Sequence, residues 1–142
     1  MLGKSDGFDW LDSGECLSLL DTQAGGIGRL AVVHGGHPVI FPVNYVLDQG
    51  QVVFRTSAGS KFDAAWRNAP VAFEIDALGP EGREGWSVLV QGRAEIIESA
   101  DRIAQVESLG LSPWADGDRP VFVAIRQSIV TGRRIRHVRP VG

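Results

Sequence analysis

Short runs of β-branched and aromatic residues alternate with glycine-containing turns along most of the chain. Residues 27–34 alternate weakly between apolar and polar positions and end at a Gly-Gly pair, which suits a tight hairpin turn. Residues 37–47 are the expected return strand, and a turn at residues 48–50 leads into a third strand at 51–56. The first half of the chain therefore predicts an antiparallel β-meander.

The second half carries further strand patterns, which we expect at residues 71–76, 86–98, 121–130 and 134–138. Gly92 interrupts the longest of them, as at a bend or bulge that lets a sheet curl. Pro42 interrupts an earlier strand and has no N–H for the sheet ladder. Its position is compatible with an ordinary edge of the sheet or with backbone left open for a ligand.

Three short helices are expected between the strands. Asp12 and Glu15 have the spacing of a capping box, Ser99 is a candidate N-cap, and Pro70 follows the end of the second helix. The side chains expected to face inward are Leu17 and Leu20 in the first helix, Phe62, Ala65 and Trp66 in the second, and Ile103 and Val106 in the third.

Six or seven strands with about three short helices predict a mainly β fold, a split β-barrel. The chain shows no internal repeat or low-complexity segment, so we expect one domain over residues 1–142, with residues 1–9 as a flexible tail.

The composition narrows the class of protein. The 142 residues carry a net charge of −3 and a pI near 5.5, with no apolar run long enough to cross a bilayer. Without an excess of positive charge, the chain is a poor candidate for binding nucleic acid, so we expect neither nucleic acid nor membrane as a partner. A single cysteine and an N-terminus without a secretory pattern predict a reducing, cytoplasmic location.

Metal and nucleotide motifs are weak in this chain. Residues 25–28 (GGIG) lack the spacing of a dinucleotide or phosphate-binding loop and are expected to form a turn. His34, His37 and His137 have no carboxylate spaced to complete a metal site, so no metal is expected. Cys16 is expected to pack on a helix face.

The stretch FRTSAGSKF (residues 54–62) has the most informative pattern. Arg55 and Thr56 fall at the end of a predicted strand, whereas Ser60 and Lys61 follow a short turn at the start of a predicted helix. Cationic and hydroxyl side chains beside a helix N-terminus are groups that bind phosphate. The alternative is that Ser60 only caps the helix and that both cations are solvated surface charges. Their occurrence together at one turn favours the anion site.

Three stretches in the order HPVIFPVNYVLD, FRTSAGSK and GWSVLVQGRAEII resemble the pyridoxamine 5'-phosphate oxidase-like flavin proteins, which have a split β-barrel. The chain is most similar to the small branch of that family related to nitroimidazole-resistance reductases, over roughly residues 10–138.

This resemblance implies a noncovalent FMN site built across a homodimer. It implies that the cofactor is contacted by Pro42, Val43, Asn44 and Tyr45 along the flavin ring, by Arg55, Thr56, Ser60 and Lys61 at the ribityl phosphate, and by Trp86 and Ser87 near the ring. Trp114 or an arginine of TGRRIRH is the implied contribution of the second subunit, and Arg134 and Arg136 rank below the phosphate residues.

The chain also departs from the larger oxidases of that family. Ser87 stands at about the position of their glutamine, and the C-terminal RRIRHVRPVG has no close match to their substrate-binding end. Both departures argue against oxidation of pyridoxamine phosphate itself.

We therefore expect an FMN-dependent oxidoreductase that acts on a small molecule, with the flavin supplying the chemistry. No residue stands out in the sequence as a catalytic acid or base. Two alternatives stay open: a deazaflavin-dependent reductase of the same fold, and a flavin- or haem-binding carrier or sensor without turnover.

Overall fold

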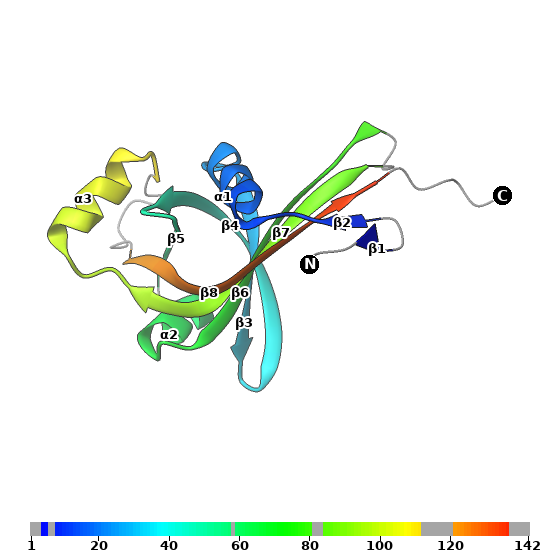
Figure 1. Ribbon diagram of the computed structural model, residues 1–142. Helices are drawn as coiled ribbons and strands as arrows, with labels where there is room; N and C mark the ends of the chain where they lie inside the picture. The colour runs from blue at the N-terminus through cyan, green and yellow to red at the C-terminus, as the bar shows by residue number, and fades with distance from the viewer. Residues whose placement is uncertain (1–3, 6–7, 58, 81–83, 112–120, 137–142) are drawn as a thin grey trace.

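A six-stranded antiparallel barrel forms the body of the protein. The computed structural model describes residues 4–5, 8–57, 59–80, 84–111 and 121–136. The barrel strands are β3 (Ile27–His34), β4 (His37–Asp48), β5 (Gln51–Thr56), β6 (Pro70–Leu78), β7 (Gly85–Ile96) and β8 (Val121–Ile135). They are ordered β8-β5-β4-β3-β6-β7, and β7 pairs again with β8 to close the barrel (Figure 1). The predicted mainly β barrel is confirmed.

The strand bounds follow the hydrophobic pattern closely. β3 and β5 span the predicted residues, and β4, β6 and β7 begin or end within two residues of the prediction. The predicted irregularity at Gly92 is confirmed, since the ladder between β7 and β8 shifts register between Gln91 and Gly92. A Cβ atom at Gly92 would collide with the carbonyl oxygen of Arg126, so the bulge requires glycine.

The last two predicted strands are one continuous strand, and the break expected after residue 130 is wrong. Thr131, Gly132 and Arg133 all pair with β7, so no turn occurs there. Gly132 instead allows the first helix to pack closely against this strand. A Cβ atom at position 132 would lie 2.6 Å from the sulfur of Cys16 in that helix. Residues 137 and 138 of the predicted strand lie outside the described part of the chain.

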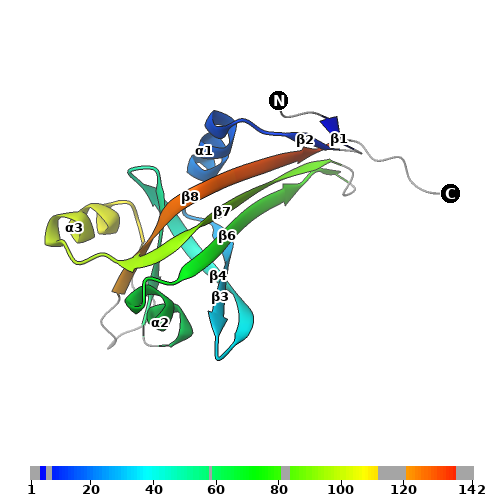
Figure 2. The same ribbon diagram turned by 60° about the horizontal axis from the view of Figure 1, so that its bottom comes forward.

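Two short strands extend the sheet at the N-terminus, where the sequence predicts a tail over residues 1–9. β2 (Phe8–Trp10) pairs with residues 133–135 of β8, and β1 (Lys4–Ser5) pairs with β2. The prediction fails because β8 runs well beyond its pairing with β5, and its outer edge there accepts another strand. β6, β7 and β8 form a long ribbon that projects from the barrel on the side away from α2 and α3 (Figure 2).

The three predicted helices are confirmed as α1 (Ser13–Thr22), α2 (Ser60–Trp66) and α3 (Ala100–Ser108). The capping box of α1 forms as expected: the Glu15 backbone N–H donates to Asp12 at 2.8 Å, and the Asp12 N–H donates back to Glu15. Ser99 likewise accepts from the Arg102 N–H at the start of α3. These local signals identify helix starts because both partners lie three residues apart.

The inward-facing residues of the helices are only partly as predicted. Leu20, Ala65 and Val106 are buried, whereas Leu17 is 45% exposed and Trp66 is 71% exposed. In α1 the inward pair is Cys16 and Leu20, four residues apart, so Cys16 packs on a helix face as expected.

The core has two parts. The larger cluster fills the barrel and includes Cys16 and Leu20 of α1 together with Ala64 and Ala65 of α2. The smaller cluster lies under α3, where Val106 packs with apolar residues of β4, β5 and β8. Within the described residues, no helix has the length and apolar character needed to cross a membrane.

Candidate functional site

Two partly buried cations lie where β5 leads into α2. Arg55 is the next-to-last residue of β5, and Lys61 is in the first turn of α2. Both side chains are half-buried. Partial burial lowers the pKa of each group, because removal from water penalises the charged form. A bound anion would offset that penalty, so this turn suits a phosphate group.

Thr56 and Ser60 complete the predicted cluster in the sequence, and the side chain of Ser60 lies outside the described part of the structure. Thr56 is buried, and its hydroxyl donates to the Ser57 carbonyl at 2.9 Å. Ser60 opens α2, but the N-cap is Gly59, which has φ 136° and makes no side-chain cap. Such a φ favours glycine. Because α2 has only seven residues, side chains rather than the helix dipole must provide most of an anion site here.

Phe41 joins this cluster, which sequence reasoning missed. The Lys61 Nζ atom lies 5.2 Å from the centre of the Phe41 ring, a cation–π contact between α2 and β4. The only signal in the sequence was an aromatic residue next to Pro42.

The four predicted residues of β4 divide between the two faces of the strand. Val43 and Tyr45 are buried in the barrel core. The Tyr45 hydroxyl donates to the Leu20 carbonyl at 2.7 Å, its ring meets Phe73 edge-on at 5.0 Å, and burial raises its pKa to about 12. Pro42 is exposed and Asn44 half-buried on the outer face. Only Pro42 and Asn44 therefore present side chains to a ligand outside the barrel.

Pro42 lies in the middle of β4, at a position where only one side of the strand is paired. This agrees with the interpretation of Pro42 as an ordinary edge proline. It pairs with Arg29 of β3, but pairing of β4 with β5 begins only at Tyr45. At Pro42, β4 is therefore paired with β3 on one side and not with β5 on the other.

An ion network lies next to Pro42 on the outer face. One guanidinium nitrogen of Arg29 contacts the carboxylates of Glu74 and Asp76, each at 3.0 Å. Burial and the neighbouring Asp76 raise the pKa of Glu74 to about 7, even though Arg29 opposes that shift. Sequence reasoning missed this network because Glu74 and Asp76 are 45 and 47 residues from Arg29.

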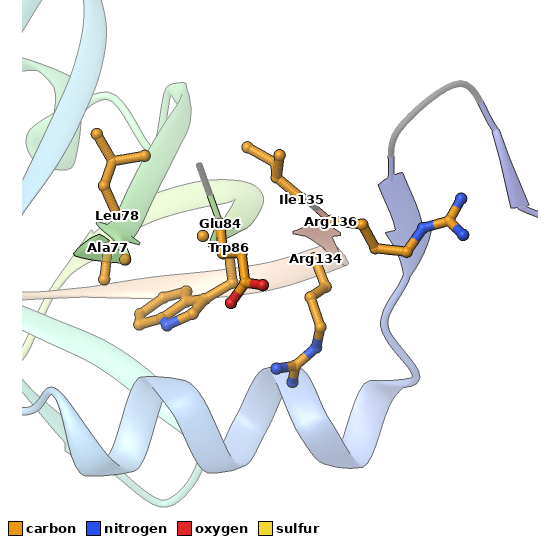
Figure 3. Close-up of a pocket in the computed structure, with 9 residues that line it drawn as sticks. Ala77, Leu78, Glu84, Trp86, Arg134, Ile135 and Arg136 are labelled. Carbon is orange, nitrogen blue, oxygen red and sulfur yellow. The ribbon is translucent and has the colours of Figure 1, made fainter. Parts of the chain in front are cut away.

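Trp86 lines a pocket at the projecting end of the sheet. The pocket has a volume of about 370 Å³ and is lined by Ala77, Leu78, Gly79, Glu84, Gly85, Trp86, Arg134, Ile135 and Arg136. Trp86 and Arg134 lie near each other, whereas Arg136 points away from the indole (Figure 3). Arg134 lies 3.7 Å from Glu15 and Arg136 lies 3.3 Å from Asp9. Ser87 follows on the other face of β7, between Asp76 and Arg133.

The ten predicted residues do not converge on one place within a single chain. Thr56 pairs with Val121 at the start of β8, whereas Trp86 pairs with Arg134 near its end. At about 3.3 Å per residue, these points are on the order of 40 Å apart along the strand. Figure 1 shows β5 on one side of the molecule and the start of β7, paired with the end of β8, on the opposite side. A flavin cannot bridge them within one subunit.

The remaining candidates contribute no site among the described residues. His34 and His37 are exposed at the β3–β4 turn, and His137 and Trp114 lie outside the described residues. In the part of the chain that the structure describes, no three metal-ligating side chains gather as they would around an ion. Burial, together with Asp12 and Glu15, raises the pKa of Cys16, which is unsuited to a reactive thiolate.

Comparison with known proteins matches this chain to one family and to a related protein. Residues 12–134 match the sequence profile of a family described as pyridoxamine 5'-phosphate oxidase. An uncharacterized protein of Mycobacterium tuberculosis strain H37Rv is 36% identical over 130 residues, covering 88% of this chain and 84% of that protein.

Two solved structures are similar over nearly their full length. A FAD-binding protein from Mycobacterium smegmatis is 34% identical with a TM-score of 0.74, covering 89% of this chain and 99% of that one. A candidate pyridoxamine 5'-phosphate oxidase from Corynebacterium glutamicum is 30% identical with a TM-score of 0.75, covering 96% of this chain and all (100%) of that one.

Proposed function

Since this chain belongs to the pyridoxamine 5'-phosphate oxidase family, we propose that it binds a flavin noncovalently and acts as a flavin-dependent oxidoreductase on a small molecule. The observation that carries the proposal is the pair of partly desolvated cations, Arg55 and Lys61, at the turn from β5 to α2. The similarity to a FAD-binding protein supports a flavin as the anionic ligand.

The flavin phosphate is held by Arg55, Thr56, Ser60 and Lys61. A guanidinium gives directional hydrogen bonds to phosphate oxygens, whereas an ammonium acts as a point charge. The contact between Lys61 and Phe41 holds the ammonium beside β4. Phe41 itself lies on the core-facing side of the strand and precedes Pro42 directly in the sequence.

The flavin ring lies along the outer face of β4, beside Pro42 and Asn44. Val43 and Tyr45 contribute through the strand that they anchor, since their side chains fill the core. Asn44 is oriented by its side-chain amide, which donates to the Gly25 carbonyl at 3.3 Å.

A second copy of the chain completes the site. Trp86, Ser87 and Arg134 are too far from Lys61 to reach the same flavin within one subunit, but a two-fold related subunit can bring its own copies of these residues to the ring. The proposed active unit is a homodimer with two equivalent sites.

The flavin supplies the transfer of electrons or hydride when it is bound. The chain's own residues bind and orient it: the cations fix the phosphate, β4 fixes the plane of the ring, and the second subunit covers it. Near the ring, the Glu74 carboxyl has a pKa of about 7, so it exchanges a proton close to neutral pH. Oxidation of pyridoxamine phosphate is not part of the proposal.

The chain's phosphate residues suit FMN, and they equally suit the phosphate nearest the ribityl chain of FAD. A deazaflavin coenzyme is the second candidate, because it carries a phosphate in the same place. Haem is not supported by the described histidines, which are exposed at the β3–β4 turn.

Native mass spectrometry with an absorbance spectrum of freshly purified protein tests the proposal. We expect a mass of two chains with two flavins and the visible absorbance bands of an oxidised flavin. Protein that binds neither FMN nor FAD when they are added would refute it, and selective binding of the deazaflavin would establish the second candidate instead.

A further inference from the structure

The strands carry exposed large apolar side chains, and among the described residues all of these lie on one face of the sheet. On the barrel strands, Ile27 is 65% exposed, Ile40 66% and Leu78 71%. The same exposed set contains Val33, Leu89, Ile129, Ile135 and, in β2, Trp10. Apolar side chains scattered singly over a surface are ordinary, whereas a contiguous group marks a contact with another molecule.

The strand register shows that this group is contiguous. Residues directly opposite each other on paired strands point to the same face, as do residues two apart on one strand. Ile40 of β4 and Ile129 of β8 end one row of paired residues across five strands, and Leu89 lies in the next row, opposite Glu74. Leu78 and Ile135 flank Gly85 at the projecting end.

The remaining members extend the same face. Ile27 and Val33 alternate with buried residues of β3, on the side of Arg29. Trp10 is opposite Arg133, which lies two residues before Ile135. We call this outer side of β4, β3, β6, β7 and the second half of β8 the open face.

Helix α3 covers the part of the outer side that lies beyond the open face. Val46 points to the same side of β4 as Ile40, yet it is only 3% exposed. It belongs to the small cluster under α3, with Val53, Val106, Phe122 and Ala124. On the opposite side of the sheet, α1 packs on the projecting ribbon (Figure 1). Apolar residues on the outer side of β4 are therefore buried where α3 reaches them and exposed on the open face.

Charges of both signs lie among the apolar residues of the open face. Arg29 contacts Glu74 and Asp76, each at 3.0 Å, so two carboxylates share one guanidinium. Arg133 is exposed, lies two strands from Asp76 on this face, and packs over the Phe8 ring at 5.3 Å. A second copy of the face can place an arginine against the carboxylates, whereas an anionic lipid surface would repel them.

The open face also carries parts of both halves of the proposed flavin site. Pro42, beside the proposed ring position, lies on it in β4, and Ser87 lies on it in β7, between Asp76 and Arg133. Because one subunit cannot bring its own projecting end to Lys61, the contact that completes the site joins β4 of one chain to the projecting ribbon of another. Both segments belong to the open face.

We propose that the open face is the surface on which a second copy of the chain docks. This inference rests on the proposed function for the shared flavin site and deepens it by naming the surface through which the partner binds. In a two-fold contact both chains use the same patch, so each substitution is present twice. An arginine introduced into the patch would be buried in the contact without an opposite charge, which is strongly unfavourable.

Arginine substitutions at Leu89 and Ile40 test this surface by sedimentation velocity at micromolar concentration. We expect a dimeric wild type, and a dimer dissociation constant at least about 100-fold higher in Leu89→Arg and in Ile40→Arg. Leu17→Arg is the matched control, because Leu17 is 45% exposed on α1, on the opposite side of the sheet, and its dimer should be unchanged. Circular dichroism and thermal unfolding verify that each variant is folded, and the use of two strands keeps the test decisive if one variant is not.

Each outcome supports or overturns the surface. Folded, monomeric Leu89→Arg and Ile40→Arg beside a dimeric Leu17→Arg support it. Dimers in both face variants overturn it, and so does dissociation of Leu17→Arg to the same extent. A monomeric wild type overturns it as well, and its co-sedimentation with phosphatidylcholine vesicles would assign the face to lipid.

Flavin titration of the same proteins separates this inference from the proposed function. A wild-type monomer that binds flavin would keep the flavin function and overturn the docking surface. A wild-type dimer that dissociates in the face variants but binds no flavin would refute the flavin function and support the docking surface.

Discussion

Lys61 of α2 lies over the ring of Phe41 in β4, with its Nζ atom 5.2 Å from the ring centre. This contact joins two segments that are separate in the sequence: the strand proposed to carry the flavin ring and the turn proposed to hold its phosphate. It holds the partly buried ammonium of Lys61 against the aromatic ring.

Replacement of Lys61 by alanine tests the phosphate site. We expect flavin binding to weaken by about 1–3 kcal/mol, because a charge-assisted hydrogen bond in a partly buried site is lost. Fluorescence titration with flavin measures the change. Lys4→Ala removes the chain's other lysine, in β1, and should leave the affinity unaltered. Equal flavin affinities for Lys61→Ala and the wild type would show that Lys61 does not bind the flavin phosphate.

Tyr45→Phe separates a structural role from a ligand contact. Loss of the hydrogen bond to the Leu20 carbonyl should lower the free energy of unfolding by about 1–2 kcal/mol, because that buried oxygen loses its donor. Flavin affinity should not change, since the ring points into the core. Chemical denaturation measures the first quantity and flavin titration the second. A large loss of affinity at full stability would mean that Tyr45 contacts the ligand.

Glu74 makes stability depend on pH in a specific direction. Its pKa is raised to about 7 in the folded chain from an ordinary value of 4.5. Between these values the folded chain holds a proton that the unfolded chain has lost, so this group's contribution to stability is present at low pH and is lost as pH rises toward 7. The unfolding free energy of Glu74→Gln, measured from pH 4 to 8, should decline less than that of the wild type.

Glu98→Gln is the matched control for this comparison, because Glu98 is exposed beyond the end of β7. It should reproduce the wild-type pH dependence. Parallel curves for Glu74→Gln and the wild type would mean that Glu74 titrates near its ordinary pKa.

A mixing experiment tests whether two subunits share each site. Lys61→Ala and Trp86→Ala should each weaken flavin binding in their own homodimers. When subunits exchange at equal concentrations, about a quarter of all sites combine intact Lys61 from one chain with intact Trp86 from the other, and these should regain full affinity. Flavin titration before and after exchange gives the readout.

Two results would exclude the shared site. One is a monomer in sedimentation at micromolar concentration. The other is a mixture of the two variants that binds flavin no better than its components, although mass spectrometry detects the mixed dimer.

Local patterns in the sequence determined much of the fold. The bounds of β3 and β5, the capping box at Asp12 and the bulge at Gly92 were predictable, because each depends on residues a few positions apart. The position of Arg55 and Lys61 on either side of one turn was predictable for the same reason, and their role in binding phosphate stays a prediction.

Only the tertiary structure determined which side chains are exposed to a ligand and which distant side chains lie in contact. The outward position of Trp66 depends on Ala64 and Ala65 entering the core, and the burial of Tyr45 depends on Leu20 and Phe73. The network of Arg29 with Glu74 and Asp76 arises because β3 and β6 pair across a long stretch of chain. Separation of Trp86 from Lys61 likewise follows from the length of β8 as one unbroken strand. Such relations depend on strand pairing and packing between distant residues, which local periodicity does not encode.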